Sequence, residues 1–379
     1  MKKAKKIDWW TIYRTVFSLL LGIALGILVI LLIDWEAVTE MSFVEKLWSL
    51  AVLFLGMMAA VFVQTVIHEA GHLVFGLLTG YGFSSFRIFS FMWIRQDGKL
   101  CLKRHSLPGT AGQCLMSPPD LVEGKMPTVL YNLGGSLMNV IASLGFFGLY
   151  FAFKNIPVLP TAMILLVAAG FLTAIMNGMP MRSSMGDNDG YNALTMRKNK
   201  ESMRATWIVL KVNEQIAKNV RLKDMPEEWF ALPSDEAMEN GMIAATGVLA
   251  CNRLMDEHRF EEADQLMAHM LKAASGMAPL HRGLIVCDRI SVELITQNHR
   301  EVLEEMLNRE QKNYMKQMGN FLTVLRTEYI YALLAEKDRE KAAKIKTRFE
   351  KRAETYPYPC DIQSERELIE IGEERAGML

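Results

Sequence analysis

The sequence predicts an all-α polytopic membrane protein with about four transmembrane helices and a membrane-associated β-hairpin, followed by a cytosolic domain of α-helical hairpin repeats. Three observations carry this prediction. The first 200 of the 379 residues contain four long stretches without Lys, Arg, Asp or Glu. The charge is divided, since residues 1–200 carry 17 Lys and Arg against 11 Asp and Glu, whereas residues 201–379 carry 25 against 31. The second half also repeats a short motif about every 40 residues.

The four uncharged stretches are 15–33, 47–67, 126–153 and 157–181. Each reaches the roughly 18–20 residues that a helix needs to cross a hydrocarbon core of about 30 Å. The first stretch follows four lysines, is too long for a signal peptide and precedes no small-x-small cleavage site, so we expect a retained anchor. Residues 1–46 are therefore predicted to form an N-terminal anchor with an acidic external loop.

The distribution of basic residues predicts the orientation of these spans. If the N-terminus is cytosolic, 15 Lys and Arg fall in the three cytosolic segments, 1–14, 80–125 and 181–200. The two external segments, 34–46 and 154–156, hold one lysine each. The five cysteines show no CxxC spacing, which is typical of reduced thiols. We therefore expect a multi-pass plasma-membrane protein whose N-terminus and C-terminal domain are cytosolic.

The pentad His68-Glu69-Ala70-Gly71-His72 lies inside an otherwise uncharged apolar run, 47–78. Imidazoles and carboxylates are costly at membrane depth, and a bound metal ion would offset that cost. On a helix, His68 and His72 lie on one face and can both reach one zinc ion, while Glu69 lies beside that face and can deprotonate a water. At 1.5 Å per residue, His68 lies roughly 30 Å along the span, in its cytosolic third.

A catalytic zinc takes three protein ligands and keeps one open position, so a third ligand must come from elsewhere. The nearest carboxylates at a suitable depth, Asp187 and Asp189, follow the fourth span, and both are candidates. Gly190, directly after Asp189, would allow a close approach of the backbone.

With this combination of pentad, membrane context and Asp-Gly, residues 47–195 resemble the site-2 protease family of intramembrane zinc metalloproteases. The family joins an HExxH helix to an Asp of a later span within an Asn-x-x-Pro…Asp-Gly motif. The resemblance implies zinc ligands at His68, His72 and Asp189, with Glu69 as the catalytic base. It also implies that Asn177 and Pro180 form the unwound segment before the third ligand, and that Asn139 matches a Gly-x-x-x-Asn position near the active site.

The chain departs from the family pattern in two places. The gap from Asn177 to Asp189 is a few residues longer than usual, so Asp187 stays open as the third ligand. A PDZ-sized or CBS-like insert is also missing. Asn139 belongs to a small and polar stripe, and ordinary packing of the third span is the alternative reading of that stripe.

Residues 83–105 alternate and are rich in residues that favour strands, and Asp97-Gly98 supplies a two-residue turn before a return strand over 99–107. Members of the resembled family use such a hairpin to hold substrate as an added strand, a mode that main-chain hydrogen bonds support. A plain amphipathic hairpin on the membrane surface is the alternative. The protease core is thus predicted over 47–200.

The domain over 201–379 is charged and has apolar residues at helical spacing. A motif recurs at His258-Arg259, His299-Arg300 and Asp338-Arg339, with arginines 41 and 39 residues apart. This region resembles the tetratricopeptide class, although its repeats are longer. Such an array would bind a substrate tail or an adaptor protein, and a stabilising cap without a partner is the alternative. Its net negative charge argues against nucleic acid.

Together these features predict a zinc metalloendopeptidase that cleaves single-span membrane proteins or signal-peptide-like remnants within the membrane. The competing hypothesis is a protease-like scaffold that presents partners through its helical domain without cleaving them. A zinc hydrolase of non-peptide substrates finds no supporting motif.

Overall fold

The computed structural model describes residues 12–13, 15–17, 19–20, 23, 39–96, 98–107, 110–183, 186–196 and 199–378. The predicted first span, 15–33, lies for the most part outside these residues, as does most of the predicted anchor domain, 1–46. The turn residue Asp97 also lies outside them.

The chain forms two compact units, each built from two separate segments. The first unit combines Met1–Thr79 with Pro127–Arg197, and the second combines Gly80–Met126 with Lys198–Leu379. The polypeptide thus leaves the first unit after α3 and returns to it at α4. The predicted functional division at residues 47 and 200 stays a prediction.

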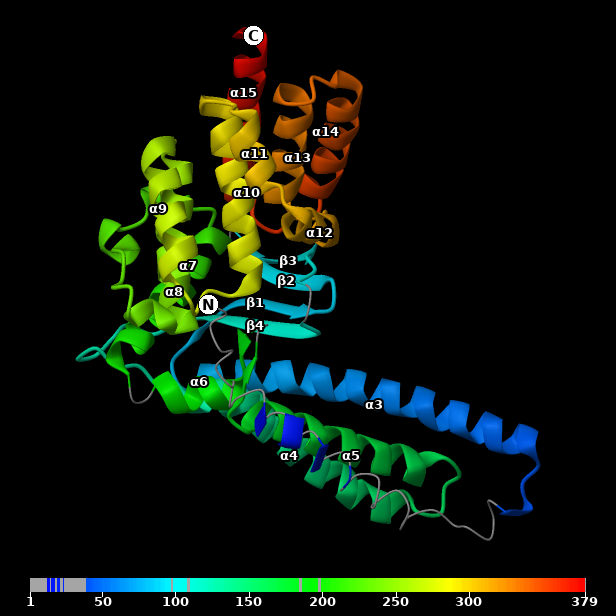
Figure 1. The fold of residues 1–379 in the computed structure, drawn as a ribbon. Coiled ribbons are helices and arrows are strands. Elements are labelled where there is room, and N and C mark those ends of the chain that lie inside the picture. The colour runs from blue at the N-terminus through cyan, green and yellow to red at the C-terminus, as the bar shows by residue number, and fades with distance from the viewer. Residues whose placement is uncertain are drawn as a thin grey trace, which may run out of the picture. The chain divides into compact units, whose positions relative to one another are not determined.

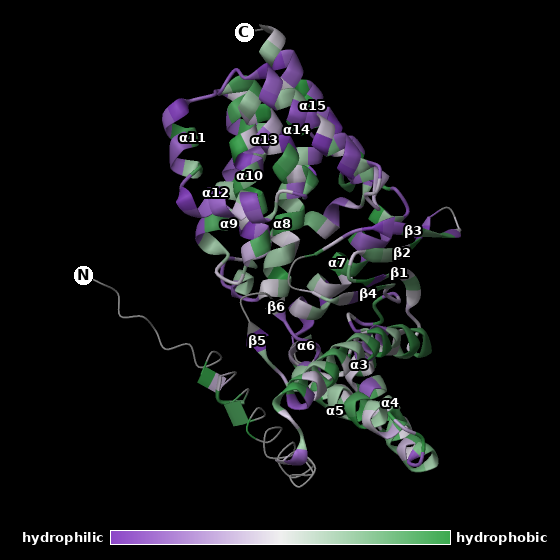
Figure 2. Ribbon diagram, turned by 90° about the vertical axis from the view of Figure 1, so that its right-hand side faces the viewer, coloured by the Kyte–Doolittle hydropathy of each residue, from purple (hydrophilic) through white to green (hydrophobic). Residues whose placement is uncertain are grey.

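Three long helices dominate the first unit (Figure 1): α3 (Phe43–Leu78), α4 (Val129–Phe153) and α5 (Leu159–Gly178). All three are long and apolar enough to cross a membrane, and they coincide with the second, third and fourth predicted spans. In Figure 2 they are hydrophobic along most of their length. The unit ends with two short strands and a short helix, β5 (Arg182–Ser183), β6 (Gly186–Asp187) and α6 (Asp189–Met196).

Local sequence explains where α3 begins and how closely it packs on α4. Ser42 and Glu45 form a capping box, in which each side chain binds the backbone N–H of the other residue. Farther along, Gly71 of α3 lies against Gly134 of α4, and a Cβ on Gly134 would lie 2.7 Å from the Gly71 carbonyl oxygen. Small residues therefore let the two backbones touch, as in many membrane helix pairs.

The second unit contains an antiparallel sheet of four strands in the order β3-β2-β1-β4. Its strands are β1 (Gly82–Ile88), β2 (Phe91–Gln96), β3 (Lys99–Arg104) and β4 (Gly112–Ser117). Gln96 pairs with Lys99, which places the β2–β3 turn at the predicted two-residue position. Gly98 there has a φ of +76°, a conformation that glycine adopts at little cost.

Two features of this sheet differ from the sequence prediction. The single strand expected before the Asp97-Gly98 turn is two strands, because Ile88 pairs with Phe91 across a tight turn at Phe89-Ser90. Phe89 takes a φ of +51° there, which is uncommon for an aromatic residue, and only Ser90 is a usual turn former. β4 was not predicted, because its sequence mixes Gly, Gln and Ser with few strand-favouring residues.

The rest of the second unit is helical. Three short 3₁₀ turns and nine α-helices are described over this part of the chain: η1 (Leu222–Asp224), η2 (Glu227–Phe230), η3 (Ala237–Glu239), α7 (Lys200–Ala217), α8 (Gly241–Asp256), α9 (Phe260–Ala273), α10 (Pro279–Thr296), α11 (Arg300–Met306), α12 (Arg309–Gln317), α13 (Leu322–Leu334), α14 (Arg339–Ala353) and α15 (Pro359–Met378).

The recurring motif marks three similar helix junctions. α9, α11 and α14 begin directly at or after its three arginines. Each junction contains a left-handed residue, since the φ angles of His258, Asn298 and Lys337 are 57°, 58° and 56°. The same turn geometry thus recurs at intervals of 40 and 39 residues, while the extra helix α12 interrupts the second hairpin. A tetratricopeptide-like array stays a prediction.

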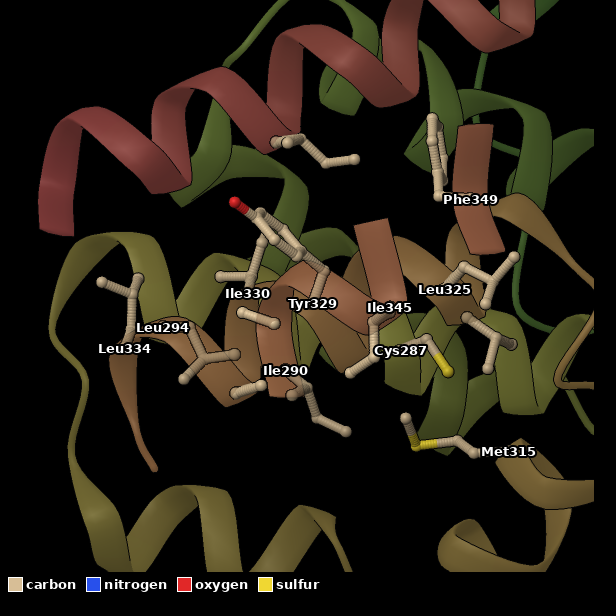
Figure 3. Packing of buried hydrophobic residues seen from close by; sticks show 14 of the residues in the cluster. Cys287, Ile290, Leu294, Met315, Leu325, Tyr329, Ile330, Leu334, Ile345 and Phe349 are labelled. Atoms are coloured by element: carbon tan, nitrogen blue, oxygen red, sulfur yellow. The ribbon is translucent and has the colours of Figure 1, made fainter. Parts of the chain in front are cut away.

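Figure 3 shows the larger apolar core of this unit, in which α10, α13 and α14 contribute Ile290, Leu325, Ile330 and Phe349. Ile290, Ile330 and Phe349 are fully buried. A second core lies between α8, α9 and α10 and is rich in methionine, including Met267 and Met270. These cores hold the helices without any contribution from the first unit.

Candidate metal centre

Three side chains of the first unit converge on one point, two from α3 and one from the start of α6. The distance from Nε2 of His68 to Oδ2 of Asp189 is 3.0 Å, and from Nε2 of His72 to the same oxygen it is 3.3 Å. The two Nε2 atoms are 3.2 Å apart. His68, His72 and Asp189 therefore form a group that could hold a metal ion.

The dimensions of this triangle fit a tetrahedral ion. Ligand atoms about 2.0–2.1 Å from a tetrahedral metal lie roughly 3.3 Å from one another. The three measured separations, 3.0, 3.2 and 3.3 Å, lie at or just under that value. The donor set of two imidazoles and one carboxylate leaves a fourth position free for a reactant, as catalytic sites require.

The outer nitrogens of both imidazoles are held by acceptor oxygens. Nδ1 of His68 lies 2.7 Å from Oδ1 of Asn139, and Nδ1 of His72 lies 2.8 Å from the carbonyl oxygen of Tyr131. Each Nδ1 must therefore carry a proton, so in its neutral form each ring presents the lone pair of Nε2. Two imidazole lone pairs and a carboxylate oxygen then face one another, and a cation among them removes the repulsion.

The orientation of His68 is fixed by a chain of amides that ends on the backbone. Gln64 donates from Nε2 to the carbonyl oxygen of Leu166 at 2.8 Å, and its own Oε1 accepts from Nδ2 of Asn139 at 2.8 Å. Because a carbonyl can only accept, Gln64 must turn its oxygen toward Asn139. Asn139 must in turn present its oxygen to His68. Gln64 and Asn139 are both fully buried.

Small residues on the neighbouring helices make room for this chain. A Cβ on Gly135 of α4 would lie 2.5 Å from the imidazole of His68. A Cβ on Gly170 of α5 would lie 2.5 Å from Nε2 of Gln64. The small and polar stripe of α4 therefore packs closely against the His68 side of the candidate site.

Asn188 positions Asp189, the candidate third ligand. Its Nδ2 donates to the carbonyl oxygens of Met176 at 2.9 Å and Met179 at 2.6 Å, and its Oδ1 accepts from the backbone N–H groups of Met181 and Tyr191. This side chain thus ties the end of α5 to the start of α6, where Asp189 is the first residue. Gly190 fits tightly, since a Cβ there would overlap the carbonyl of Gly178.

The two candidate aspartates have different partners. Asp187 accepts a hydrogen bond from Nε of Arg182 at 3.2 Å, whereas Asp189 faces both histidines. Asp189, and not Asp187, is therefore the aspartate placed to bind a metal together with the two histidines.

The other predicted site residues lie in different settings. Glu69 is buried on α3 beside the two histidines, with 8% of its surface exposed. Asn177 donates to the carbonyl of Thr173 in its own helix at 3.0 Å, and Pro180 follows the end of α5. Neither Asn177 nor Pro180 is hydrogen-bonded to the three candidate ligands in the described part of the chain.

The sequence analysis did not predict that Gln64 and Asn188 belong to the candidate site. Gln64 lies four residues before His68, so a polar residue on the same helical face of an apolar span was the available signal. Asn188 lies between the two candidate aspartates and offers an ordinary turn signal, which does not distinguish a local turn from a link to another helix.

Comparisons with known proteins add no identity to this geometry. No family model matches the chain, and no curated protein or solved structure matches it.

Proposed function

We propose that the protein is an intramembrane zinc metalloprotease of the site-2 protease type. One observation carries the proposal: Nε2 atoms of two histidines on an apolar helix long enough to cross a membrane lie within 3.3 Å of each other and of a carboxylate oxygen of Asp189. Such a group is costly in lipid unless a cation neutralises it. The buried Glu69, next to His68 on the same helix, supplies the remaining acid–base group.

The proposed mechanism assigns separate tasks to these residues. Zinc bound by His68, His72 and Asp189 would supply a Lewis acid that polarises a peptide carbonyl and a water molecule. Glu69 accepts a proton from the attacking water and delivers it to the leaving amine. Asn139 and the carbonyl of Tyr131 keep both imidazoles in the tautomer that exposes Nε2 to the metal. Packing by α4 and α5 limits the entry of bulk water.

The proposed substrates are single-span membrane proteins or signal-peptide-like remnants in an extended conformation. β3 pairs with β2 and is an edge strand of the described sheet, so its outer edge before Arg104 offers main-chain hydrogen bonds to such a segment. In this proposal the enzyme is a multi-pass plasma-membrane protein, and its cytosolic helical domain binds a substrate tail or an adaptor.

The substitution Glu69→Gln tests the proposal. It keeps the size of the side chain but removes the base, so we expect zinc content to remain at the wild-type level while cleavage falls by at least about 100-fold. Single-span proteins captured with this variant would serve as substrates for the purified wild-type enzyme in detergent. Glu201→Gln, an exposed glutamate at the start of α7, is the matched control and should cleave normally. Equal cleavage by wild type and Glu69→Gln would instead favour the protease-like scaffold.

A further inference from the structure

A cleft in the second unit carries an unusual concentration of positive charge. It has a volume of about 480 Å³ and lies where the end of β3 meets the C-terminal turn of α14 and the start of α13. Four cations line it: Arg104, Arg348, Lys351 and Arg352. Among the described residues, its lining contains no aspartate or glutamate.

Most of these cations are not neutralised within the described part of the chain. Arg348 lies 3.5 Å from a carboxylate oxygen of Glu328. Arg104, Lys351 and Arg352 form no ion pair there, and two of them instead stack on rings, Arg104 on Phe91 and Arg352 on Tyr356. Like charges gathered in a cleft repel one another and focus a positive potential, which an anion would relieve.

The walls of the cleft are held by the backbone, so the charges do not simply spread apart. Nη1 of Arg352 donates to the carbonyl oxygen of Arg104 at 3.0 Å, and its Nε donates to that of Asn320 at 3.1 Å. The backbone N–H of Arg104 donates to the carbonyl oxygen of Thr355 at 3.2 Å. These bonds join β3 to the end of α14 and keep the cleft open between them.

A buried histidine gives a second, independent sign of a ligand. His105 is 8% exposed, lines the cleft, and has a buried Nδ1 that forms no hydrogen bond with the described protein. Its ring packs edge-on against Tyr356 with 5.4 Å between centroids. A buried polar atom without a partner is costly, so the wall of the cleft holds an unused polar group beside the four cations.

We propose that this cleft binds a phosphate group carried by a ligand with an apolar or aromatic portion. Guanidinium groups match phosphate oxygens in geometry, and a phosphate monoester brings about 1.5–2 negative charges at neutral pH. Neutral hydroxyl donors from Ser90, Ser106 and Thr355 complete the rim, while Phe321, Leu325 and Tyr356 supply an apolar floor. The volume lies within the roughly 300–1,000 Å³ of small-molecule sites, so it exceeds the need of phosphate alone.

Two probes distinguish the sources of such a phosphate. The full chain, in an uncharged detergent, is titrated by calorimetry with each probe in turn. Inorganic pyrophosphate represents a soluble phosphate compound, and a short-chain phosphatidic acid represents a lipid headgroup. Tighter binding of pyrophosphate assigns the cleft to a soluble compound, and tighter binding of the lipid assigns it to a headgroup. Malonate, a dicarboxylate, measures the preference for phosphate over carboxylate.

The double variant Arg104→Gln/Lys351→Gln should weaken binding of the preferred probe by about 100-fold, roughly tenfold for each charged contact removed. Both side chains are exposed, so the fold should persist, which circular dichroism checks. The control Lys272→Gln/Lys316→Gln removes the same charge from exposed positions outside the cleft and should leave the affinity unchanged. Failure of both probes to bind, equal binding by the two double variants, or equal binding of malonate would overturn the proposal.

Discussion

The two units bury polar side chains in opposite ways. In the first unit, a line of hydrogen bonds from Leu166 through Gln64 and Asn139 orients His68, whose Nε2 lies beside Nε2 of His72 and Oδ2 of Asp189. In the second unit, two buried arginines are paired with carboxylates. Arg221 is flanked by Asp256 and Glu367, and Arg326 is flanked by Asp288 and Glu365.

This difference separates a site that needs an ion from a network that stabilises a fold. In the arginine networks, each carboxylate already lies beside a cationic side chain. An added metal ion is therefore not needed to neutralise them. With neutral imidazoles, the cluster on α3 and α6 presents only acceptors, and such a group could hold a cation. Burial of polar groups is therefore not by itself a functional signal, whereas the balance of donors and acceptors is.

The largest effect is expected from a substitution that breaks one of the arginine networks. Arg326→Met would leave Asp288 and Glu365 buried without their cation, and should destabilise the second unit by about 3–5 kcal/mol. Hydrogen exchange of α10 and α13, followed by mass spectrometry on the full chain, measures this loss. Arg300→Met, which removes an exposed pair with Glu304, should leave the exchange unchanged. Similar protection in wild type and Arg326→Met would show that the network is dispensable.

A smaller effect is expected at Asp361, a buried carboxylate whose charge is incompletely paired. Burial, together with the nearby charges of Glu365 and Asp256, raises the pKa of Asp361 to about 7. The unfolded pKa is near 3.9, so the folded state favours the protonated form. This contribution to stability is present below about pH 4 and is lost as the pH rises through 7.

The substitution Asp361→Asn should therefore raise the melting temperature of the second unit at pH 8, while changing it little at pH 4. Thermal unfolding at the two pH values, compared with Asp338→Asn at an exposed helix cap, measures the difference. The same change in melting temperature at both pH values would contradict the proposed titration of Asp361.

The next effect is confined to the first unit. Gln64→Leu should break the line of amides that orients His68 and weaken metal binding by about 10–100-fold, as loss of an outer partner of a metal ligand commonly does. Asn177→Leu removes an amide that bonds within its own helix and should leave metal affinity unchanged. Competition with a chelator measures both affinities. If Asn177→Leu weakens binding as much as Gln64→Leu, the resemblance to the Asn-x-x-Pro motif would gain weight over the observed hydrogen bonds.

Much of the first unit followed from composition alone. An uncharged run of membrane length has few structural solutions, so the spans that become α3, α4 and α5 were predictable. The sheet was less predictable, because the turn at Phe89-Ser90 places a phenylalanine at a positive φ, which its sequence does not signal. The helix starts at Phe260, Arg300 and Arg339 followed from a repeated motif, but the interruption by α12 did not.

The candidate site was likewise predictable only in part. His68 and His72 are four residues apart on one helix, so their meeting follows from helical geometry. The choice between Asp187 and Asp189 depends on a turn held by Asn188 and on the pairing of Asp187 with Arg182, neither of which spacing reveals. Gln64 acts through Asn139, which is 75 residues away, and only packing of α3 on α4 brings the two together.

The most direct test of the account is the zinc content of the purified full chain, measured by mass spectrometry of the metal, for wild type, Asp189→Ala and Asp187→Ala. We predict one zinc ion per chain in the wild type and in Asp187→Ala, and a loss in Asp189→Ala that exceeds the roughly 100-fold affinity change typical of outer partners. Zinc at the wild-type level in Asp189→Ala, or no transition metal in the wild type, would contradict the assignment of His68, His72 and Asp189 as a metal centre.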